Sequence, residues 1–184
     1  MRLTLIPAIL SLVASAACVS SAPRSAPDTT PEVLIDQSGR VIRTTESPTE
    51  MAFPTSVDST FRAVTAAYTA LGIEPSSVDP ATRVVSRQHM ILRSRFQGKL
   101  LSTAFDCGGG QFGPRADQGR ITADITSRVA ARGSASAVTT TIEASLVPND
   151  GASRDPIRCV SHGGIEESLR REVSMQLGVP YQKP

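Results

Sequence analysis

Three cysteines and two histidines are the residues of this chain best suited to nucleophilic or metal chemistry. Zinc sites in proteins usually show a Cys-x-x-Cys motif or closely spaced histidines. Cys107 and Cys159 are far apart in the chain, and neither His89 nor His162 stands at a metal-ligand spacing from them. We therefore expect no metal site, and no motif indicates a cofactor.

Residues 105–110 combine Asp106 with a cysteine and three glycines, a composition that suggests a phosphate-binding loop. The Lys-Ser or Lys-Thr that follows such a loop in nucleotide-binding proteins is missing. Asp117 is the other carboxylate nearby, and nothing marks the two aspartates as an acid/base pair. His162 precedes a predicted helix without a carboxylate partner, which is typical of a capping or surface residue. Since no GxSxG, SxxK or HExxH motif occurs, we expect a protein that is not an enzyme.

Residues 83–96 alternate between basic and apolar side chains. The odd-numbered positions carry Arg83, Arg87, His89, Arg93 and Arg95, and the even-numbered positions carry Val84, Met90, Leu92 and Phe96. Because successive strand residues point to opposite faces, a strand here would have one apolar and one basic face. A row of guanidinium groups suits the phosphates of lipid head groups or acidic envelope polymers. The row is our candidate anion-binding patch, and the alternative is a basic face that is only solvated.

The overall composition argues against nucleic acid as a partner. The 19 basic and 17 acidic residues leave a net charge of +2, too small for a protein that binds by gross basicity. Aromatic residues make up 4% of the chain, too few for a surface that stacks bases. The 184 residues suffice for one ordinary domain with a tail.

Residues 1–17 are typical of a secretory signal peptide. Arg2 is followed by a largely apolar run from Leu3 to Val13 and then by small residues. That run is shorter than the roughly 20 apolar residues that a membrane-spanning helix needs. We therefore expect export, with removal of residues 1–17.

Cys18 follows the small residues at the end of this signal, and the pattern resembles the lipobox of bacterial lipoproteins. In that family the cysteine is lipidated and becomes the first residue of the mature protein. Ser15 departs from the pattern, which prefers an aliphatic residue at that position. The resemblance implies that Cys18 is lipidated and anchors the chain to a membrane. Ordinary cleavage beside Cys18 is the alternative that the residues leave open.

The remaining cysteines suggest a disulfide. If Cys18 carries lipid, Cys107 and Cys159 are left, and exported compartments are oxidising enough to join them. Closing a loop of about fifty residues stabilises a fold by roughly 4 kcal/mol in the chain-entropy model. We expect a Cys107–Cys159 disulfide, with two separate thiols as the less favoured alternative.

The rest of the chain divides into three parts. Residues 18–31 are rich in serine, proline and threonine, which predicts a disordered tether after the lipidated cysteine. Residues 32–50 are expected to form a hairpin and linker, in which Val33–Ile35 and Val41–Ile42 are the strands. Residues 51–184 are expected to form a single folded domain.

Two helices and one long hairpin are predicted within that domain. An apolar stripe spans Val57–Leu71 after the capping residue Ser56, and a second stripe spans Gly164–Leu177. Between them, Ile121–Val129 and Val138–Leu146 alternate as strands joined by a polar turn. We predict an α+β fold, in which an antiparallel sheet is packed on one face by an N-terminal and a C-terminal helix.

One stretch of the domain resembles a known family. Ser56 to Gln88, with Phe61-Arg62-Ala63-Val64, Leu71-Gly72-Ile73, Asp79 and Arg83-Val84-Val85, is similar to a repeat unit of the accessory lipoprotein of the outer-membrane β-barrel assembly machinery. The chain departs from that family in having one domain, no tryptophan and an added cysteine pair. The resemblance implies a helix-grip-like fold and a non-enzymatic envelope lipoprotein that docks on a protein assembly. By the same analogy, Val19 after Cys18 implies delivery to the outer membrane, facing the periplasm.

Two functions remain open from the sequence. The first is an interaction or scaffold domain that is anchored to a membrane by its N-terminal lipid. The second is a module that binds an anionic or apolar small ligand, such as a lipid head group or envelope polymer, in a groove between sheet and helix. An open apolar cavity in that groove would favour the second function, and a filled core with an exposed patch would favour the first.

Overall fold

The computed structural model describes residues 32–35, 41–44, 49–148 and 155–181, with the backbone alone for the first two ranges. The predicted signal peptide, lipidation site and tether in residues 1–31 lie outside this part of the chain. Within the described ranges, no helix is long and apolar enough to cross a membrane.

A small hairpin precedes the domain in the chain. Strand β1 (Glu32–Ile35) pairs antiparallel with β2 (Val41–Thr44), and Ile35 lies opposite Val41. The two strands predicted here are confirmed, while the residues that join them lie outside the described part of the chain.

The centre of the main sheet is one long antiparallel hairpin. Strands β11 (Arg120–Arg132) and β12 (Ala135–Val147) pair along their full length, from Arg120 opposite Val147 to Arg132 opposite Ala135. Buried and more exposed residues alternate along β11, which is the two-residue period of a sheet with one covered face. The predicted long hairpin is therefore confirmed.

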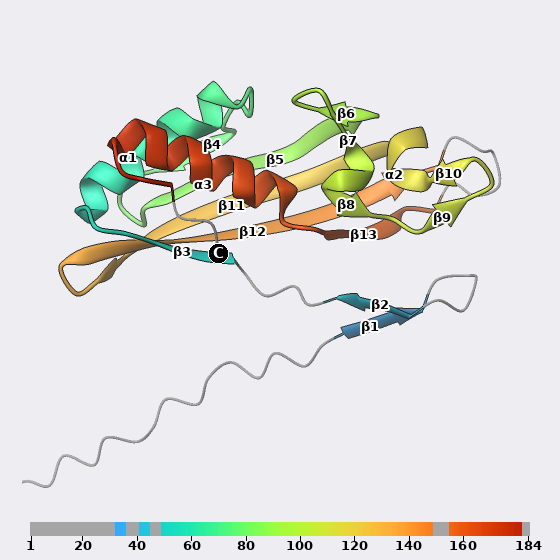
Figure 1. The fold of residues 1–184 in the computed structure, drawn as a ribbon, viewed down its shortest axis with the longest axis horizontal. Helices are drawn as coiled ribbons and strands as arrows, with labels where there is room; N and C mark the ends of the chain where they lie inside the picture. The colour runs from blue at the N-terminus through green and yellow to red at the C-terminus, as the bar shows by residue number, and fades with distance from the viewer. Residues whose placement is uncertain (1–31, 36–40, 45–48, 149–154, 182–184) are drawn as a thin grey trace, which may run out of the picture. The chain divides into compact units, whose positions relative to one another are not determined.

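The other strands add to this hairpin on both sides (Figure 1). Strand β5 (Val84–Arg93) pairs with β11, while β3 (Thr49–Phe53) and β13 (Ile157–Ser161) pair with β12. The short strands are β4 (Ser77–Asp79), β6 (Arg95–Phe96), β7 (Lys99–Leu100), β8 (Phe105–Asp106), β9 (Gly109–Gly110) and β10 (Gly113–Pro114). Strands β9 and β10 pair only with each other, and all these pairings are antiparallel.

Two short strands go beyond the elements expected from the sequence. Strand β3 begins at Thr49, before the domain boundary expected at Met51, and its side chains of Met51 and Phe53 are buried. Strand β4 precedes β5 in the chain and pairs with it. Both segments are too short to form a strand alone, so each depends on pairing with another strand. The partner of β3 is distant in sequence, and the partner of β4 follows it after a turn whose geometry composition does not specify.

Helices α1 (Val57–Ala70) and α3 (Gly164–Leu177) pack side by side across one face of the sheet (Figure 1). The Ser56 side chain accepts a hydrogen bond from the backbone N–H of Ser59, which caps α1 as predicted. Gly178 ends α3 in the left-handed conformation that glycine adopts without strain. The two remaining helical segments are short, namely η1 (Leu101–Thr103) and α2 (Arg115–Gln118).

The hydrophobic core fills the space between the helices and the sheet. Tyr68, Ile125, Leu146, Ile165 and Leu169 are each at most 1% exposed and come from both helices and both central strands. Burying such side chains contributes about 1.5–3 kcal/mol each. The predicted antiparallel sheet with packed helices is therefore confirmed as the architecture.

Hydroxyl groups tie α1 to the sheet inside this core. The Tyr68 hydroxyl donates to Ser127 Oγ at 3.0 Å, and Ser127 Oγ lies 2.9 Å from Thr140 Oγ1. Thr60 Oγ1 and Ser136 Oγ form a second buried pair at 2.7 Å. Because each hydroxyl has a partner, these polar side chains are buried without leaving unsatisfied groups.

The predicted disulfide is confirmed, and the alternative of two separate thiols is wrong. Cys107 and Cys159, which are 52 positions apart in sequence, are joined with an S–S distance of 2.07 Å. Cys159 belongs to β13 and Cys107 directly follows β8, so the bond reinforces the pairing of these two strands. A third cysteine, Cys18, lies outside the described residues.

The buried phenol of Tyr68 predicts a specific loss of stability at high pH. Burial raises the pKa of Tyr68 to about 12, and the Ser127 hydrogen bond only partly opposes this effect. Because the pKa is higher in the folded than in the unfolded chain, the contribution is complete below about pH 10 and is lost as the pH rises toward 12. Between about pH 9 and pH 11.5, we expect the wild-type protein to lose about 2 kcal/mol more unfolding free energy than Tyr68→Phe.

Urea denaturation of both proteins at each pH measures this difference. At neutral pH the Tyr68→Phe variant should be less stable by about 1 kcal/mol, because it lacks the hydrogen bond to Ser127. Parallel pH profiles for the two proteins would show that the Tyr68 phenol does not titrate as a buried group.

Candidate functional site

The sheet face opposite the helices, which we call the outer face, carries polar side chains. On β11 these are the residues that alternate with the buried ones, namely Arg120, Thr122, Asp124, Thr126 and Arg128. The side chains of Arg120, Thr126 and Arg128 are exposed, and those of Thr122 and Asp124 are half-buried. The outer face is therefore the side of the sheet on which polar groups are available to a ligand.

The strand register arranges the polar side chains of the outer face in rows. Thr122 lies opposite Ser145 of β12, and Ser145 lies opposite Arg158 of β13. In the next row, Asp124 lies opposite Glu143. Residues directly opposite in an antiparallel pair point to the same face. The first row thus ends in a cation, and the second row brings two carboxylates together.

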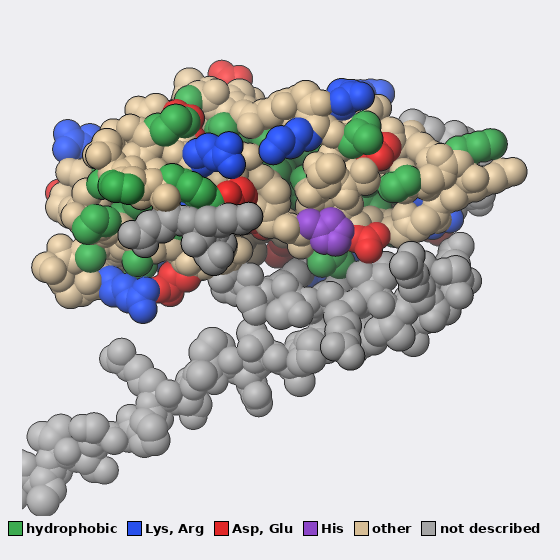
Figure 2. Space-filling view, viewed as in Figure 1, with side chains coloured by type: hydrophobic (Ala, Val, Ile, Leu, Met, Phe, Trp, Pro, Cys, Tyr) green, Lys and Arg blue, Asp and Glu red, His purple; other side chains and the backbone are tan. Residues whose placement is uncertain are grey.

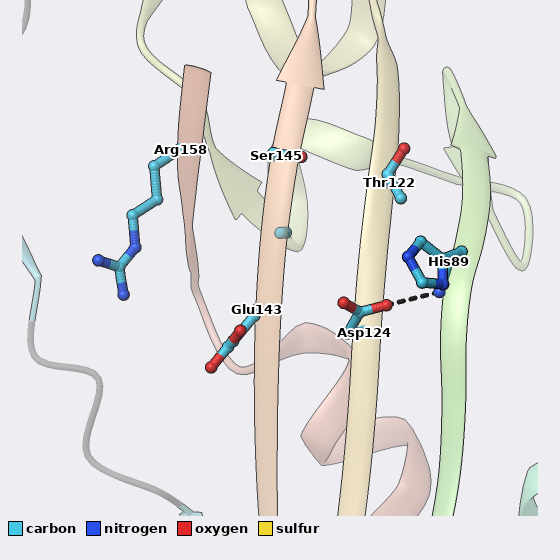
Figure 3. A pocket seen from close by; sticks show the side chains of 7 residues that line it. His89, Thr122, Asp124, Glu143, Ser145 and Arg158 are labelled. Atoms are coloured by element: carbon cyan, nitrogen blue, oxygen red, sulfur yellow. Dashed lines mark hydrogen bonds between the residues drawn. The ribbon is translucent and has the colours of Figure 1, made fainter. Parts of the chain in front are cut away.

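A pocket of about 550 Å³ lies over these two rows. Its lining comes from β5, β11, β12 and β13, and consists of His89, Thr122, Asp124, Glu143, Ala144, Ser145 and Arg158 (Figure 3). Most of the lining residues are hydroxyl-bearing or charged, which favours a polar ligand over an apolar one. The volume falls within the usual range of about 300–1,000 Å³ for small-molecule sites.

A β-bulge brings His89 to the edge of this pocket. Ala123 pairs with Met90 and Ile125 pairs with Arg87, so two residues of β5 lie opposite Asp124 alone. His89 is one of them, and its φ of 54° is in the left-handed region. Its backbone N–H donates to Asp124 Oδ1 at 2.5 Å, as Figure 3 shows by a dashed line. Such bulges redirect side chains and are common beside functional sites.

The two carboxylates of the pocket differ in what they already bind. Asp124 accepts the hydrogen bond from the His89 backbone and so has a structural role. Glu143 is exposed and has no hydrogen-bond or ion-pair partner among the residues that the structure describes. Like charges directly opposite in a sheet are destabilising. The pair is thus a local cost to stability that a cationic group in the pocket would relieve.

The predicted basic face of residues 83–96 is wrong, because the five residues do not share one side of the sheet. Arg83 forms an ion pair of 2.6 Å with Asp58 of α1, and Arg87 donates to the Glu74 carbonyl oxygen at 3.1 Å. Arg87 lies opposite the buried Ile125, which puts it on the helix side of the sheet.

The other three residues of the predicted patch lie elsewhere. His89 lines the pocket, and Arg93 lies on the outer face opposite Arg120. Arg95 belongs to β6 and donates to the Gly98 carbonyl oxygen at 2.6 Å. The bulge shifts the alternation by one residue within β5, so odd-numbered positions before and after it point to opposite faces.

The helix side of the domain shows no concentration of charge that would replace the predicted patch. In Figure 2, Lys and Arg side chains on this side are interspersed with Asp, Glu and hydrophobic side chains. Among the surfaces described, the pocket on the outer face is therefore the better candidate for recognition.

The other side chains considered for chemistry have structural roles. Asp106 Oδ1 accepts from the backbone N–H of Gly108, and Asp117 Oδ1 accepts from that of Ser102, each at 2.8 Å. His162 is exposed and donates its backbone N–H to the Ala104 carbonyl oxygen. The glycine-containing segment thus turns beside the disulfide, and its carboxylates hold backbone groups.

The pocket residues do not form a metal centre. Within the described part of the chain, no three His, Cys, Asp or Glu side chains are grouped so that they could hold a metal ion. In the pocket, the Glu143 side chain extends away from His89, so these two side chains do not converge on one point (Figure 3).

Several pocket and outer-face residues were not singled out from the sequence, among them the charged residues Arg120, Asp124, Glu143 and Arg158. The alternation of the long hairpin already places the first three on its polar side. Their neighbours across the sheet follow only from the register, which the sequence does not specify. Arg158 joins the site because β13 pairs with β12.

Comparison with known proteins assigns no family. No family model matches the chain, and no curated protein matches it in sequence. The resemblance of residues 56–88 to the accessory lipoprotein of the β-barrel assembly machinery stays a prediction.

The bulge predicts how substitutions of Asp124 affect stability. We expect Asp124→Ala to lower the unfolding free energy by about 1 kcal/mol, because the His89 N–H loses its acceptor. Asp124→Asn keeps an oxygen acceptor and should lose less. Urea denaturation of the two variants and the wild type measures the difference. Equal stability of Asp124→Ala and Asp124→Asn would mean that the hydrogen bond does not hold the bulge.

Proposed function

We propose that this protein is an exported, membrane-tethered and non-enzymatic interaction domain that binds its partner with the outer face of the sheet. The observation that carries the proposal is the difference between the two faces of the sheet. One face is buried by α1 and α3, and the other has a polar pocket of about 550 Å³. A face that no described helix covers and that carries clustered charges is the natural binding surface of such a domain.

Export is supported by the cysteines. The Cys107–Cys159 disulfide is compatible with an oxidising compartment outside the cytoplasm. Cys18 is the one cysteine of the sequence that does not take part in this disulfide, in agreement with a lipidated residue at the start of the mature chain. Residues 18–31 would then be the tether that holds the domain away from the outer membrane, on its periplasmic side.

The proposed kinship with helix-grip domains is part of the same proposal. The order of a helix, several antiparallel strands and a second helix supports it. A protein assembly of the envelope is the partner that the resemblance implies. The class of partner is therefore inferred from the resemblance of residues 56–88, whereas the binding surface is inferred from the position of the pocket.

The alternative function, a ligand-binding groove between sheet and helices, is less well supported. The space where that ligand would lie contains the buried side chains of Tyr68, Ile125 and Leu169. The pocket that is best suited to a ligand lies on the opposite face and is lined by polar residues. A filled core with a recognition surface outside it favours the interaction domain.

Metabolic labelling tests the proposed anchor. Cells that produce the full chain should incorporate radioactive palmitate into the protein, and Cys18→Ser should abolish the label. Cys107→Ser is the matched control, because it removes a cysteine without touching the lipidation site. Labelling that survives Cys18→Ser would contradict the lipoprotein assignment.

Site-specific photocrosslinking in intact envelopes tests the proposed surface. A photoreactive side chain at Thr141, which is exposed on the outer face beside Glu143, should form a discrete adduct. Gln176 is exposed on α3 and is the control position for the helix side. We expect the Thr141 adduct to disappear when Glu143→Lys reverses a pocket charge. Adducts that arise from Gln176 instead of Thr141 would show that the helix side is the binding surface.

A further inference from the structure

We propose that the outer-face pocket binds a small zwitterion, specifically the linked ammonium and carboxylate groups of a short peptide. This inference rests on the proposed function, because it assumes that the outer face is the binding surface. In this arrangement, Asp124 and Glu143 hold the ammonium group, and Arg158 holds the carboxylate. Thr122 and Ser145 lie in the same row as Arg158, beside the charged groups, and contact the peptide bond.

The acidic end of the pocket has the composition of an ammonium site. Asp124 and Glu143 lie directly opposite each other on neighbouring strands, and both side chains are on the outer face. The Asp124 carboxylate already accepts one hydrogen bond from His89, and a carboxylate can accept several more. Glu143 has no partner of its own among the described residues. An ammonium group supplies three donors and a positive charge, which is what this pair lacks.

The basic end of the pocket suits a carboxylate. Arg158 lines the pocket in the neighbouring row, directly opposite Ser145. A guanidinium group has five N–H donors, so Arg158 can bind a carboxylate with two of them and still serve another contact. Arg93 and Arg120 lie opposite each other one row further along, and their charges add to the positive potential at this end.

The distance between the two ends corresponds to a short peptide. Asp124, Glu143 and Arg158 come from three successive strands, and neighbouring strands lie about 4.7–4.9 Å apart. An extended peptide spans at most roughly 3.3–3.6 Å per residue, so a dipeptide reaches from the carboxylate pair to Arg158 across the strands. Thr122 and Ser145 then offer hydroxyl groups that both donate and accept, as a peptide N–H and C=O require. A simple anion or a simple amine would use only one end of the pocket.

Three matched probes test the inference. Glycylglycine carries both charges, N-acetylglycylglycine carries only the carboxylate, and glycylglycine amide carries only the ammonium group. Each is titrated into the ¹⁵N-labelled full chain, and binding is followed by the amide shifts of Thr122 and Ser145. We expect glycylglycine to bind about tenfold more tightly than either capped probe, which corresponds to about 1.4 kcal/mol for the lost charged contact.

Single substitutions assign each end of the probe to its partner. Glu143→Gln should weaken glycylglycine and the amide but leave N-acetylglycylglycine unchanged, whereas Arg158→Gln should have the converse effect. Glu74→Gln and Arg128→Gln remove the same charges outside the pocket and should change none of the affinities. Glu143 is preferred to Asp124 for this test because Asp124 also holds the bulge.

The possible failures are distinguishable from failure of the proposed function. Equal affinity for the three probes, or absence of binding by glycylglycine, would overturn the zwitterion site. If the Thr141 adduct nevertheless forms, the outer face remains the interaction surface and only the ligand class is wrong. If neither the adduct nor the glycylglycine shifts are observed, both proposals fail.

Discussion

The pairing of β11 with β12 is the constraint on which the rest of this structure depends. Strand β5 pairs with β11, strands β3 and β13 pair with β12, and α1 packs across both. Side chains alternate with a period of two along each strand, so a slip of one residue would exchange the two faces of the hairpin. Such a slip would expose Ile125 and bury Asp124. The burial of one face therefore determines the register, and the register determines which polar groups meet on the other.

Polar side chains occur on both faces of this hairpin, and the environment gives them opposite roles. On the inner face, Ser127 and Thr140 pair with each other and with the Tyr68 hydroxyl, which satisfies each of them within the core. On the outer face, Asp124 and Glu143 place two negative charges side by side without a cation between them. The first arrangement stabilises the contact between helix and sheet. In the second, Asp124 holds the bulge, whereas Glu143 has no partner among the described residues, which is the physical reason to associate the pair with binding.

Much of the fold could be predicted from local patterns. Apolar stripes and caps indicate Val57–Ala70 and Gly164–Leu177 as helices, and strict alternation indicates the long hairpin. Strand β3 had a weaker signal in the alternation of Met51 and Phe53, but five residues do not specify a strand without a partner. The candidate site could be predicted only in part. His89 was singled out for its charge, whereas Asp124 and Arg158, which line the same pocket, come from strands that only the tertiary structure brings together.

The sequence by itself determined the helices and the central hairpin, because these follow from periodicity and capping within the chain. It predicted the pairing of Cys107 with Cys159 only on the condition that Cys18 carries lipid. It also determined which face of the hairpin is polar. Only the tertiary structure decided which residues of β5 join that face. The bulge at His89 requires an acceptor from Asp124, far away in sequence, and it shifts the alternation in the middle of the strand. A local pattern cannot contain such a shift, because its cause is a hydrogen bond between residues of two different strands.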